Sequence, residues 1–219
     1  MTRPSDEWPV GGSYTFGGRQ GRMSPTRQRA LDTLVPLYLI STPLIAATSL
    51  RLVVEIGCGK GEATVAMARG ELDSLVIACE PNEATMAHLA TLLDGAAVDN
   101  VRLWIGDAFD LLAVIGNESV DEVRVWFPDP WPKPRHAHKR LVTPLRLARI
   151  VDALKVGGLF RLATDDPQYA QQTLDAIGNE DRLVGALVPR PHERPVTTFE
   201  ARALRAGREP IDITATRLR

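Results

Sequence analysis

Cysteine is scarce in this sequence, and long apolar runs are missing from it. The 219 residues include two cysteines, Cys58 and Cys79, which cannot form a disulfide framework, so we expect free thiols in a reducing cytoplasm. The most apolar stretch, residues 31–50, is broken by Pro36 and Pro43, which argues against a membrane span. The chain opens on charged residues and proline, so no signal peptide is expected. These features favour a soluble cytoplasmic protein.

A strong overall charge is also lacking, because the formal net charge is −1, yet the charges are spread unevenly. Residues 71–122 carry eleven Asp/Glu and one Arg, whereas residues 131–150 carry six Lys/Arg and no acid. Arginine is in excess at both ends, with five Arg against two acids in residues 1–30 and eight Arg against four acids in residues 182–219. This pattern indicates either a polyanion-binding surface or ordinary solvated charges.

Strand-like apolar runs alternate with helix-like segments from residue 52 onward, which predicts an α/β fold with a parallel sheet covered on both faces. In such sheets ligands bind outside the carboxyl ends of the strands. We expect a single domain over residues 25–219, preceded by a flexible basic arm, residues 1–24, rich in Gly, Ser, Arg and Pro. The predicted strands are 52–56, 75–80, 101–106, 121–127, 159–164, 183–189 and 211–218, and the predicted helices are 24–38, 63–70, 82–95, 107–116, 143–158 and 167–178.

A glycine-rich turn closes the first predicted strand. It reads EIGCGKG over residues 55–61, and it places Gly57, Gly59 and Gly61 where the backbone turns toward the next helix. The second strand ends on Glu80, and an acid there can accept hydrogen bonds from both ribose hydroxyls of a nucleotide-like cofactor. A tight structural turn with no ligand is the alternative.

Two cofactor classes fit this turn. A dinucleotide would place its pyrophosphate at the helix N-terminus. S-adenosylmethionine has no phosphate, and Glu55, just before the glycines, suits its cationic methionine end better. Asp107, after the third strand, can hold the adenine amino group or simply cap the following helix. These points favour S-adenosylmethionine.

The segment FPDPWPKPRHAHKR, residues 127–140, follows the fourth strand. Its alternating prolines predict a stiff loop, because proline fixes φ and has no backbone donor. An acid beside an aromatic, Asp129 and Trp131, suits a flipped-out base, and the basic tail of the loop suits phosphates. A proline-rich surface turn anchored by the tryptophan is the alternative, and we expect His136 and His138 to be solvated rather than to bind a metal. The four basic residues of the tail are Lys133, Arg135, Lys139 and Arg140.

These motifs together resemble the bacterial tRNA (guanine-N7-)-methyltransferases. The matching segments cover nearly the whole chain in the right order, and the PDPWPK segment and the late TxFExR pattern are the most specific of them. They are residues 19–31, 55–61, Glu80, 106–108, 127–141, 154–158, 163–165 and 194–202.

The resemblance implies a class I, Rossmann-like methyltransferase fold, with a mostly parallel seven-stranded sheet and an antiparallel C-terminal strand. It implies methyl transfer from S-adenosylmethionine to N7 of the variable-loop guanine of tRNA. We expect no metal, no membrane and no obligate protein partner. Glu55, Glu80, Asp107 and Asp129 would line the cofactor site, with Asp129 also catalytic. Lys133, Asp165, Thr197, Thr198, Phe199 and Glu200 would contact tRNA, and Asp129 or Glu200 would stabilise the charge that develops on the base.

Three other interpretations stay open from the residues alone. The first is a class I methyltransferase with another substrate, such as the exocyclic amine of a base. The second is a nicotinamide-dependent oxidoreductase, against which Glu55 and the missing third glycine of GxGxxG argue. The third is a tRNA-binding protein without catalysis. For residues 197–200, a loop before the last strand is the alternative to a substrate contact.

Overall fold

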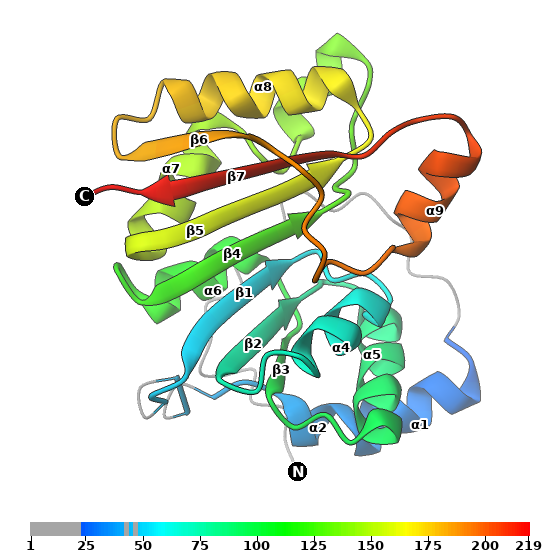
Figure 1. Ribbon diagram of the computed structural model, residues 1–219. Helices are drawn as coiled ribbons and strands as arrows, with labels where there is room; N and C mark the ends of the chain where they lie inside the picture. The colour runs from blue at the N-terminus through cyan, green and yellow to red at the C-terminus, as the bar shows by residue number, and fades with distance from the viewer. Residues whose placement is uncertain (1–22, 42–43, 46–47) are drawn as a thin grey trace.

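The computed structural model describes residues 23–41, 44–45 and 48–219 of the chain. A seven-stranded sheet runs through it in the order β3-β2-β1-β4-β5-β7-β6 (Figure 1). Strands β1 to β5 pair in parallel with their neighbours, whereas β7 is antiparallel to both β5 and β6. The predicted α/β fold and the antiparallel last strand are therefore confirmed. The strands are β1 Arg51–Ile56, β2 Ser74–Cys79, β3 Val101–Trp104, β4 Val120–Trp126, β5 Leu154–Thr164, β6 Leu183–Val188 and β7 Ile211–Arg217.

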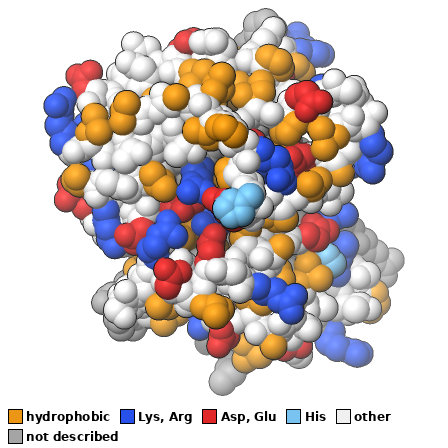
Figure 2. Space-filling view, in the orientation of Figure 1, with side chains coloured by type: hydrophobic (Ala, Val, Ile, Leu, Met, Phe, Trp, Pro, Cys, Tyr) orange, Lys and Arg blue, Asp and Glu red, His pale blue; other side chains and the backbone are white. Residues whose placement is uncertain are grey.

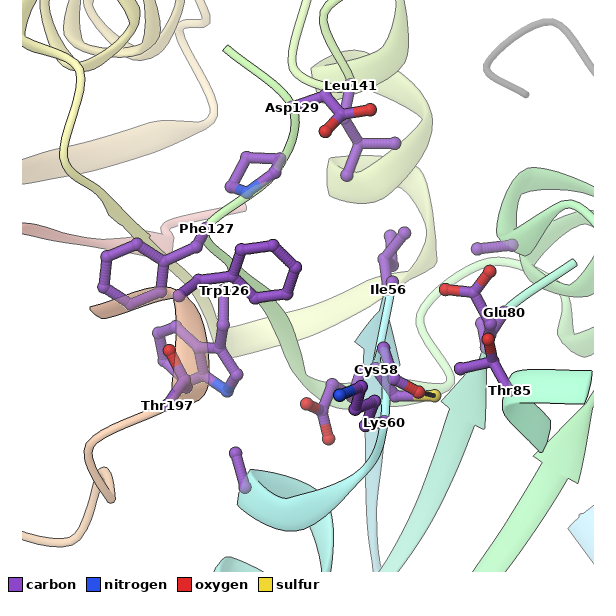
Figure 3. Close-up of a pocket in the computed structure, with 18 of the residues that line it drawn as sticks. Ile56, Cys58, Lys60, Glu80, Thr85, Trp126, Phe127, Asp129, Leu141 and Thr197 are labelled. Atoms are coloured by element: carbon purple, nitrogen blue, oxygen red, sulfur yellow. Dashed lines mark hydrogen bonds between the residues drawn. The ribbon is translucent and has the colours of Figure 1, made fainter. Parts of the chain in front are cut away.

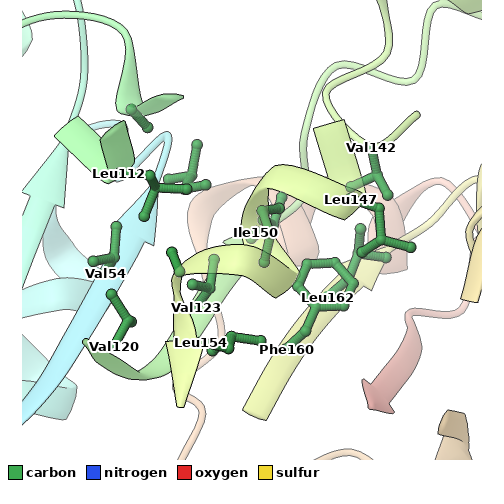
Figure 4. Close-up of a cluster of buried hydrophobic side chains, with 14 of the residues drawn as sticks. Val54, Leu112, Val120, Val123, Val142, Leu147, Ile150, Leu154, Phe160 and Leu162 are labelled. Atoms are coloured by element: carbon green, nitrogen blue, oxygen red, sulfur yellow. The ribbon is translucent and has the colours of Figure 1, made fainter. Parts of the chain in front are cut away.

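Helices cover both faces of the sheet because the strand side chains alternate between two apolar layers. Val54 of β1 faces the layer that contains helices α6, α7 and α8, and Val53 faces the layer that contains α1, α4 and α5. Figure 4 shows the first layer, where β4 and β5 side chains meet those of α7. The helices are α1 Pro25–Thr33, α2 Val35–Tyr38, α4 Glu62–Ala68, α5 Glu83–Ala96, α6 Ala108–Ile115, α7 Pro144–Ala153, α8 Pro167–Gly178 and α9 Thr198–Arg205, with a 3-10 helix, η1, at Pro134–Lys139.

Side-chain caps set where several of these helices begin. Ser24 accepts a hydrogen bond from the backbone N–H of Arg27, and Pro25 occupies the first helical position of α1. The helix predicted over residues 24–38 is interrupted at Leu34, so that α1 and α2 are separate. Residues 1–22 of the predicted arm lie outside the described residues. In the described part of the chain, no helix combines the length and apolar character of a membrane span.

The helix predicted over residues 143–158 is too long by five residues, since α7 ends at Ala153. Leu154 already pairs with Val120 of β4, and the next pair along these strands is Glu122 with Leu159. The intervening residues form an irregularity in β5, where Gly157 adopts a positive φ of 81°. The glycines that suggested a helix end therefore mark a bulge within a strand.

Candidate active site

A cavity of about 450 Å³ opens at the carboxyl ends of β1, β2 and β4. We call it the strand-end cavity. In Figure 3, the turn after β1 lies between Glu80 on one side and Trp126 and Phe127 on the other. This is the edge at which parallel α/β sheets bind ligands. Several predicted site residues line the cavity, namely Glu55, Gly57, Gly59, Glu80, Asp107, Asp129, Thr197, Thr198 and Phe199.

The backbone of the glycine turn forms one wall of this cavity. Gly57, Gly59 and Gly61 have φ values of 75°, 54° and 81°, in the left-handed region that favours glycine. A Cβ at Gly57 would meet no atom within 4 Å, so that position is open on the cavity side. A Cβ at Gly61 would lie 2.3 Å from Cδ1 of Leu89, so Gly61 permits α4 to pack on α5 and does not line the cavity.

Two carboxylates flank the turn, and burial raises the pKa of both. Glu55 is 2% exposed, and desolvation is the largest cause of its raised pKa. Glu80 is half-buried, and its Oε1 accepts a hydrogen bond from the backbone N–H of Asn82 at 3.2 Å. Burial raises the pKa of Glu80 most, backbone N–H groups oppose that shift, and the charge of Asp129 adds to it. The site thus concentrates negative charge, which suits a cationic ligand.

Of the two roles open for Asp107 from the sequence, the structure shows the helix cap, and the contact with an adenine amino group stays a prediction. Its carboxylate accepts a hydrogen bond from the backbone N–H of Phe109 at 2.8 Å and so caps α6. It also lines the strand-end cavity. Trp104 fixes the turn by donating from Nε1 to the backbone oxygen of Asp107 at 2.9 Å.

The proline-rich loop, residues 127–140, forms the opposite wall. Phe127 and Trp131 have positive φ values of 50° and 43°, which are unfavourable for bulky side chains and need support from neighbours. The Phe127 N–H donates to the backbone oxygen of Ala163 at 2.8 Å. Asp129 follows Phe127 by two residues and lies exposed at the cavity.

Arg140 holds this loop from behind, which corrects the phosphate-binding role predicted for it. It is 5% exposed, and its Nε donates to the backbone oxygen of Pro130 at 2.8 Å. Its Nη1 donates to Oε1 of Gln172 at 2.6 Å, which connects the loop to α8. Lys133 and Arg135 lie exposed on the same loop, outside the cavity lining.

Trp131 is covered by a cation within the loop itself. The ammonium of Lys139 lies 4.8 Å from the centroid of the Trp131 ring, and His136 meets the ring edge-on at 5.8 Å. Trp131 and Lys139 both line the strand-end cavity. Among the described residues, no group of three His, Cys, Asp or Glu is arranged to hold a metal ion.

Thr198–Arg205 form a helix, α9, where a loop was the alternative prediction. Thr197 caps it by accepting from the backbone N–H of Glu200 at 3.0 Å. The spacing Thr-x-x-Glu is a capping-box signal, so the sequence did contain a sign of this helix. Phe199 and Arg202 of α9 line the cavity, and Cε2 of Phe199 lies 4.0 Å from the Cβ position of Gly59.

A buried ion cluster fixes α9 to the sheet. We call it the Arg194 cluster, and its members are Arg190, Arg194, Glu200 and Asp212. Arg194 is fully buried, and its guanidinium lies 2.5 Å from Glu200 and 2.9 Å from Asp212 of β7. The same guanidinium lies 5.4 Å from the ring centroid of Phe127, at the start of the proline-rich loop. Figure 2 shows acidic and basic side chains gathered across the middle of one face, to which the buried Arg194, Glu200 and Asp212 scarcely contribute.

Glu200 therefore lies away from the place that the resemblance implies for it. Its carboxylate is 1% exposed and is enclosed by Arg194 and Arg190, whose Nε lies 2.8 Å away. Burial alone would raise the pKa of Glu200, but hydrogen bonds from the two guanidinium groups hold that pKa below its usual value. Asp165 also lies outside the cavity lining. Its carboxylate forms an ion pair with Arg208 at 2.7 Å.

Comparisons with known proteins identify the family of this chain. The family described as "Putative methyltransferase" matches residues 49–213. A tRNA (guanine-N(7)-)-methyltransferase of Nitrosospira multiformis is 36% identical over 210 residues, which cover 91% of this chain and 92% of that protein. The enzyme of that name from Nocardia farcinica is 38% identical, over 88% of this chain and 80% of that protein.

A solved structure extends the comparison to the fold. It is a 16S rRNA (adenine(1408)-N(1))-methyltransferase of Catenulisporales acidiphilia with its cosubstrate SAM, which is 18% identical to this chain. The match covers 81% of this chain and 89% of that one, with a TM-score of 0.54. The fold is that of class I methyltransferases, and by its sequence the chain belongs to the tRNA (guanine-N(7)-)-methyltransferase family.

Proposed function

We propose that this protein transfers a methyl group from S-adenosylmethionine to N7 of the variable-loop guanine of tRNA. The observation that carries the proposal is the strand-end cavity. The glycine turn, with Glu55 and Glu80 beside it, lines the same cavity as Asp129 and residues of α9. The chain also belongs to this family. In this proposal the reaction takes place in the cytoplasm, and the enzyme needs no metal and no second protein chain.

The glycine turn and the acidic residues beside it hold the cofactor. The open Cβ position at Gly57 leaves room for a ligand to approach the backbone, and the buried carboxylate of Glu55 suits an ammonium group. Glu80 suits the ribose hydroxyls, and Asp107 suits the adenine amino group. When bound, S-adenosylmethionine supplies an electrophilic methyl group on a sulfonium.

The acceptor side needs little acid–base chemistry. Guanine N7 already has a free lone pair, so no side chain has to remove a proton before the new N–CH3 bond forms. Positive charge then develops on the purine, and Asp129, exposed at the cavity, stabilises that charge and orients the ring. Asp129 is therefore the catalytic residue of the proposal.

The tRNA is held around this centre by two elements. Lys133 and Arg135 of the proline-rich loop are exposed and suit phosphates. Thr197, Thr198 and Phe199, at the start of α9, line the cavity and suit the nucleotide that enters it. Glu200 and Asp165 act on tRNA through their arginine partners, Glu200 by fixing α9 and Asp165 by orienting Arg208.

The test is methyl transfer from labelled S-adenosylmethionine to two unmodified tRNA transcripts that differ in one variable-loop base, guanine or adenine. Products are identified as nucleosides by mass spectrometry. We expect 7-methylguanosine from the guanine transcript alone. Label in neither transcript, from a protein that still binds the cofactor, would contradict the tRNA assignment. Methylation of an exocyclic amine would favour the alternative acceptor.

A further inference from the structure

Trp131 lines the strand-end cavity, and a cation lies over one face of its ring. The Lys139 ammonium lies 4.8 Å from the ring centroid, within the range of a cation–π contact. Both residues line the cavity, whereas His136, at the edge of the ring, does not. Because Lys139 lies over one face of the ring and itself lines the cavity, that face is the candidate contact for a base in the cavity.

We propose that this face of Trp131 receives the positively charged 7-methylguanine ring, and that Trp131 is a further catalytic residue. The inference rests on the proposed function. Lys139 is a placeholder, which leaves the face when the base enters. A lysine has a flexible stem and a strongly hydrated ammonium, so it can move from the ring toward solvent or a phosphate.

The charge balance of the reaction explains why a ring face would favour the transition state. The N7 lone pair forms a bond to the methyl carbon, the S–CH3 bond breaks, and its electron pair stays on sulfur, with no proton transferred. The purine begins neutral and ends as a delocalised cation. A tryptophan face attracts a cation through its quadrupole, and it attracts a neutral base less. The interaction therefore strengthens as the reaction proceeds, which is the condition for lowering a barrier.

The structure also holds the indole in place. Trp131 has a φ of 43°, a conformation that bulky residues rarely adopt and that surrounding contacts must maintain. Arg140 bonds to the backbone oxygen of the preceding Pro130, and His136 packs edge-on at an interplanar angle of 89°. Trp131 is two residues from Asp129, so one stiff loop presents a carboxylate and an aromatic face together. Such preorganisation is what stabilisation of developing charge requires.

The first test replaces Trp131, by site-specific incorporation, with a series of progressively fluorinated tryptophans. Fluorine weakens the ring quadrupole and scarcely changes its shape, so kcat for tRNA methylation should fall stepwise along the series while KM for tRNA stays constant. For Trp131→Leu the loss in kcat should lie between about 2-fold and about 30-fold, the range of a cation–π contact. A constant kcat across the fluorinated series would overturn the inference.

The second test measures nucleoside binding by NMR to the protein loaded with S-adenosylhomocysteine, at mildly acidic pH where the methylated base is cationic. We expect 7-methylguanosine to bind more tightly than guanosine, and the difference to shrink along the fluorinated series. Lys139→Met should tighten binding of 7-methylguanosine, with Lys155→Met, outside the cavity lining, as the control that leaves it unchanged. Unchanged or weaker binding to Lys139→Met would overturn the placeholder role. If wild-type protein formed no 7-methylguanosine in tRNA, the proposed function would fail, and the binding result would still decide the role of the ring.

Discussion

The two walls of the strand-end cavity are held by different kinds of restraint. The wall after β1 is made of backbone: Gly57 and Gly59 turn with positive φ, and the N–H groups of Gly57 and Cys58 donate to the backbone oxygen of Cys79. The wall formed by the proline-rich loop and α9 depends on buried side chains far apart in sequence, above all Arg140 and Arg194. Substitutions that change backbone freedom should therefore disturb the first wall. Removal of a single charged side chain should disturb the second.

The division also separates two tasks. Glu55 and Glu80 belong to the backbone-built wall and suit the cofactor, whereas Asp129 and Phe199 belong to the side-chain-held wall and suit the base. Asp129 nevertheless lies close enough to Glu80 to raise its pKa. The walls are therefore distinct in construction but electrostatically coupled, and the predictions below test that distinction.

The largest effect is expected from Asp129→Ala. Removing a group aimed at developing charge typically costs about 100-fold to about 1,000-fold in turnover, and we expect a loss of that size in kcat. Cofactor affinity, measured by calorimetry, should change far less. The matched change on the other wall, Glu80→Gln, should weaken cofactor binding more than Asp129→Ala does. Unchanged turnover in Asp129→Ala would contradict the catalytic role.

The second effect concerns the Arg194 cluster. Glu200→Gln removes one carboxylate from a buried group that contains two arginines, and breaking such a pair typically costs about 3 kcal/mol of unfolding free energy. Denaturation of the RNA-free protein measures this loss, with Glu209→Gln, at an exposed site, as the control. If Glu200 instead contacted tRNA directly, the Glu200→Gln variant without RNA would be as stable as wild type, and only its affinity for tRNA would fall.

The same pair of proteins gives a pH test. The pKa of Glu200 is lower in the folded chain than its usual value of 4.5, so its stabilising contribution is complete above that value. The contribution is lost as the pH falls through the lowered pKa of the folded state. The difference in stability between wild type and Glu200→Gln should therefore be largest near neutral pH and shrink below pH 4.5. A difference that grew on acidification would contradict the ion-pair assignment.

A smaller effect should distinguish two glycines of the turn after β1, of which Gly57 lines the cavity and Gly61 does not. Gly61→Ala brings a Cβ against Leu89 and adds overpacking to an unfavourable φ, so we expect about 2 kcal/mol of lost stability. Gly57→Ala has the same φ problem without the clash, so it should cost about 1 kcal/mol and weaken cofactor binding. Thermal unfolding and cofactor titration of both variants check this. Equal stability losses would show that the packing at Leu89 contributes little.

The smallest effect is expected on the RNA side. Lys133→Ala should weaken tRNA binding and reduce the slope of log K against log salt by about 1, as for one lost phosphate contact. Arg69→Ala removes an exposed charge just after α4 and should leave the slope unchanged. Filter binding across a salt series measures both. A wild-type slope in Lys133→Ala would argue against a phosphate contact at that residue.

Much of the fold could be predicted because local signals agreed with the global arrangement. The apolar runs predicted the strands, and Ser24 followed by Pro25 is a local signal for the start of α1. The end of α7 was mispredicted because Gly157 and Gly158 serve a bulge in β5, and a bulge needs a partner strand that local sequence does not reveal.

The site divides in the same way. The glycine turn is local in sequence, and its place could be predicted from the strand before it. The buried positions of Arg140 and Glu200 could not, because each depends on partners from distant segments, Gln172 for Arg140 and Arg190 and Arg194 for Glu200. A charged residue within a motif is as consistent with a ligand contact as with a buried ion pair until its neighbours are known.

The most direct test of the account is methylation of a tRNA transcript that carries 7-deazaguanine at the variable-loop position. This base keeps the shape and the Watson–Crick edge of guanine but has a C–H group in place of N7. We predict that the transcript binds like the guanine form and accepts no methyl group, while the guanine transcript yields 7-methylguanosine. Methyl transfer to the deaza base would contradict N7 as the acceptor and, with it, the chemistry assigned to Asp129 and Trp131.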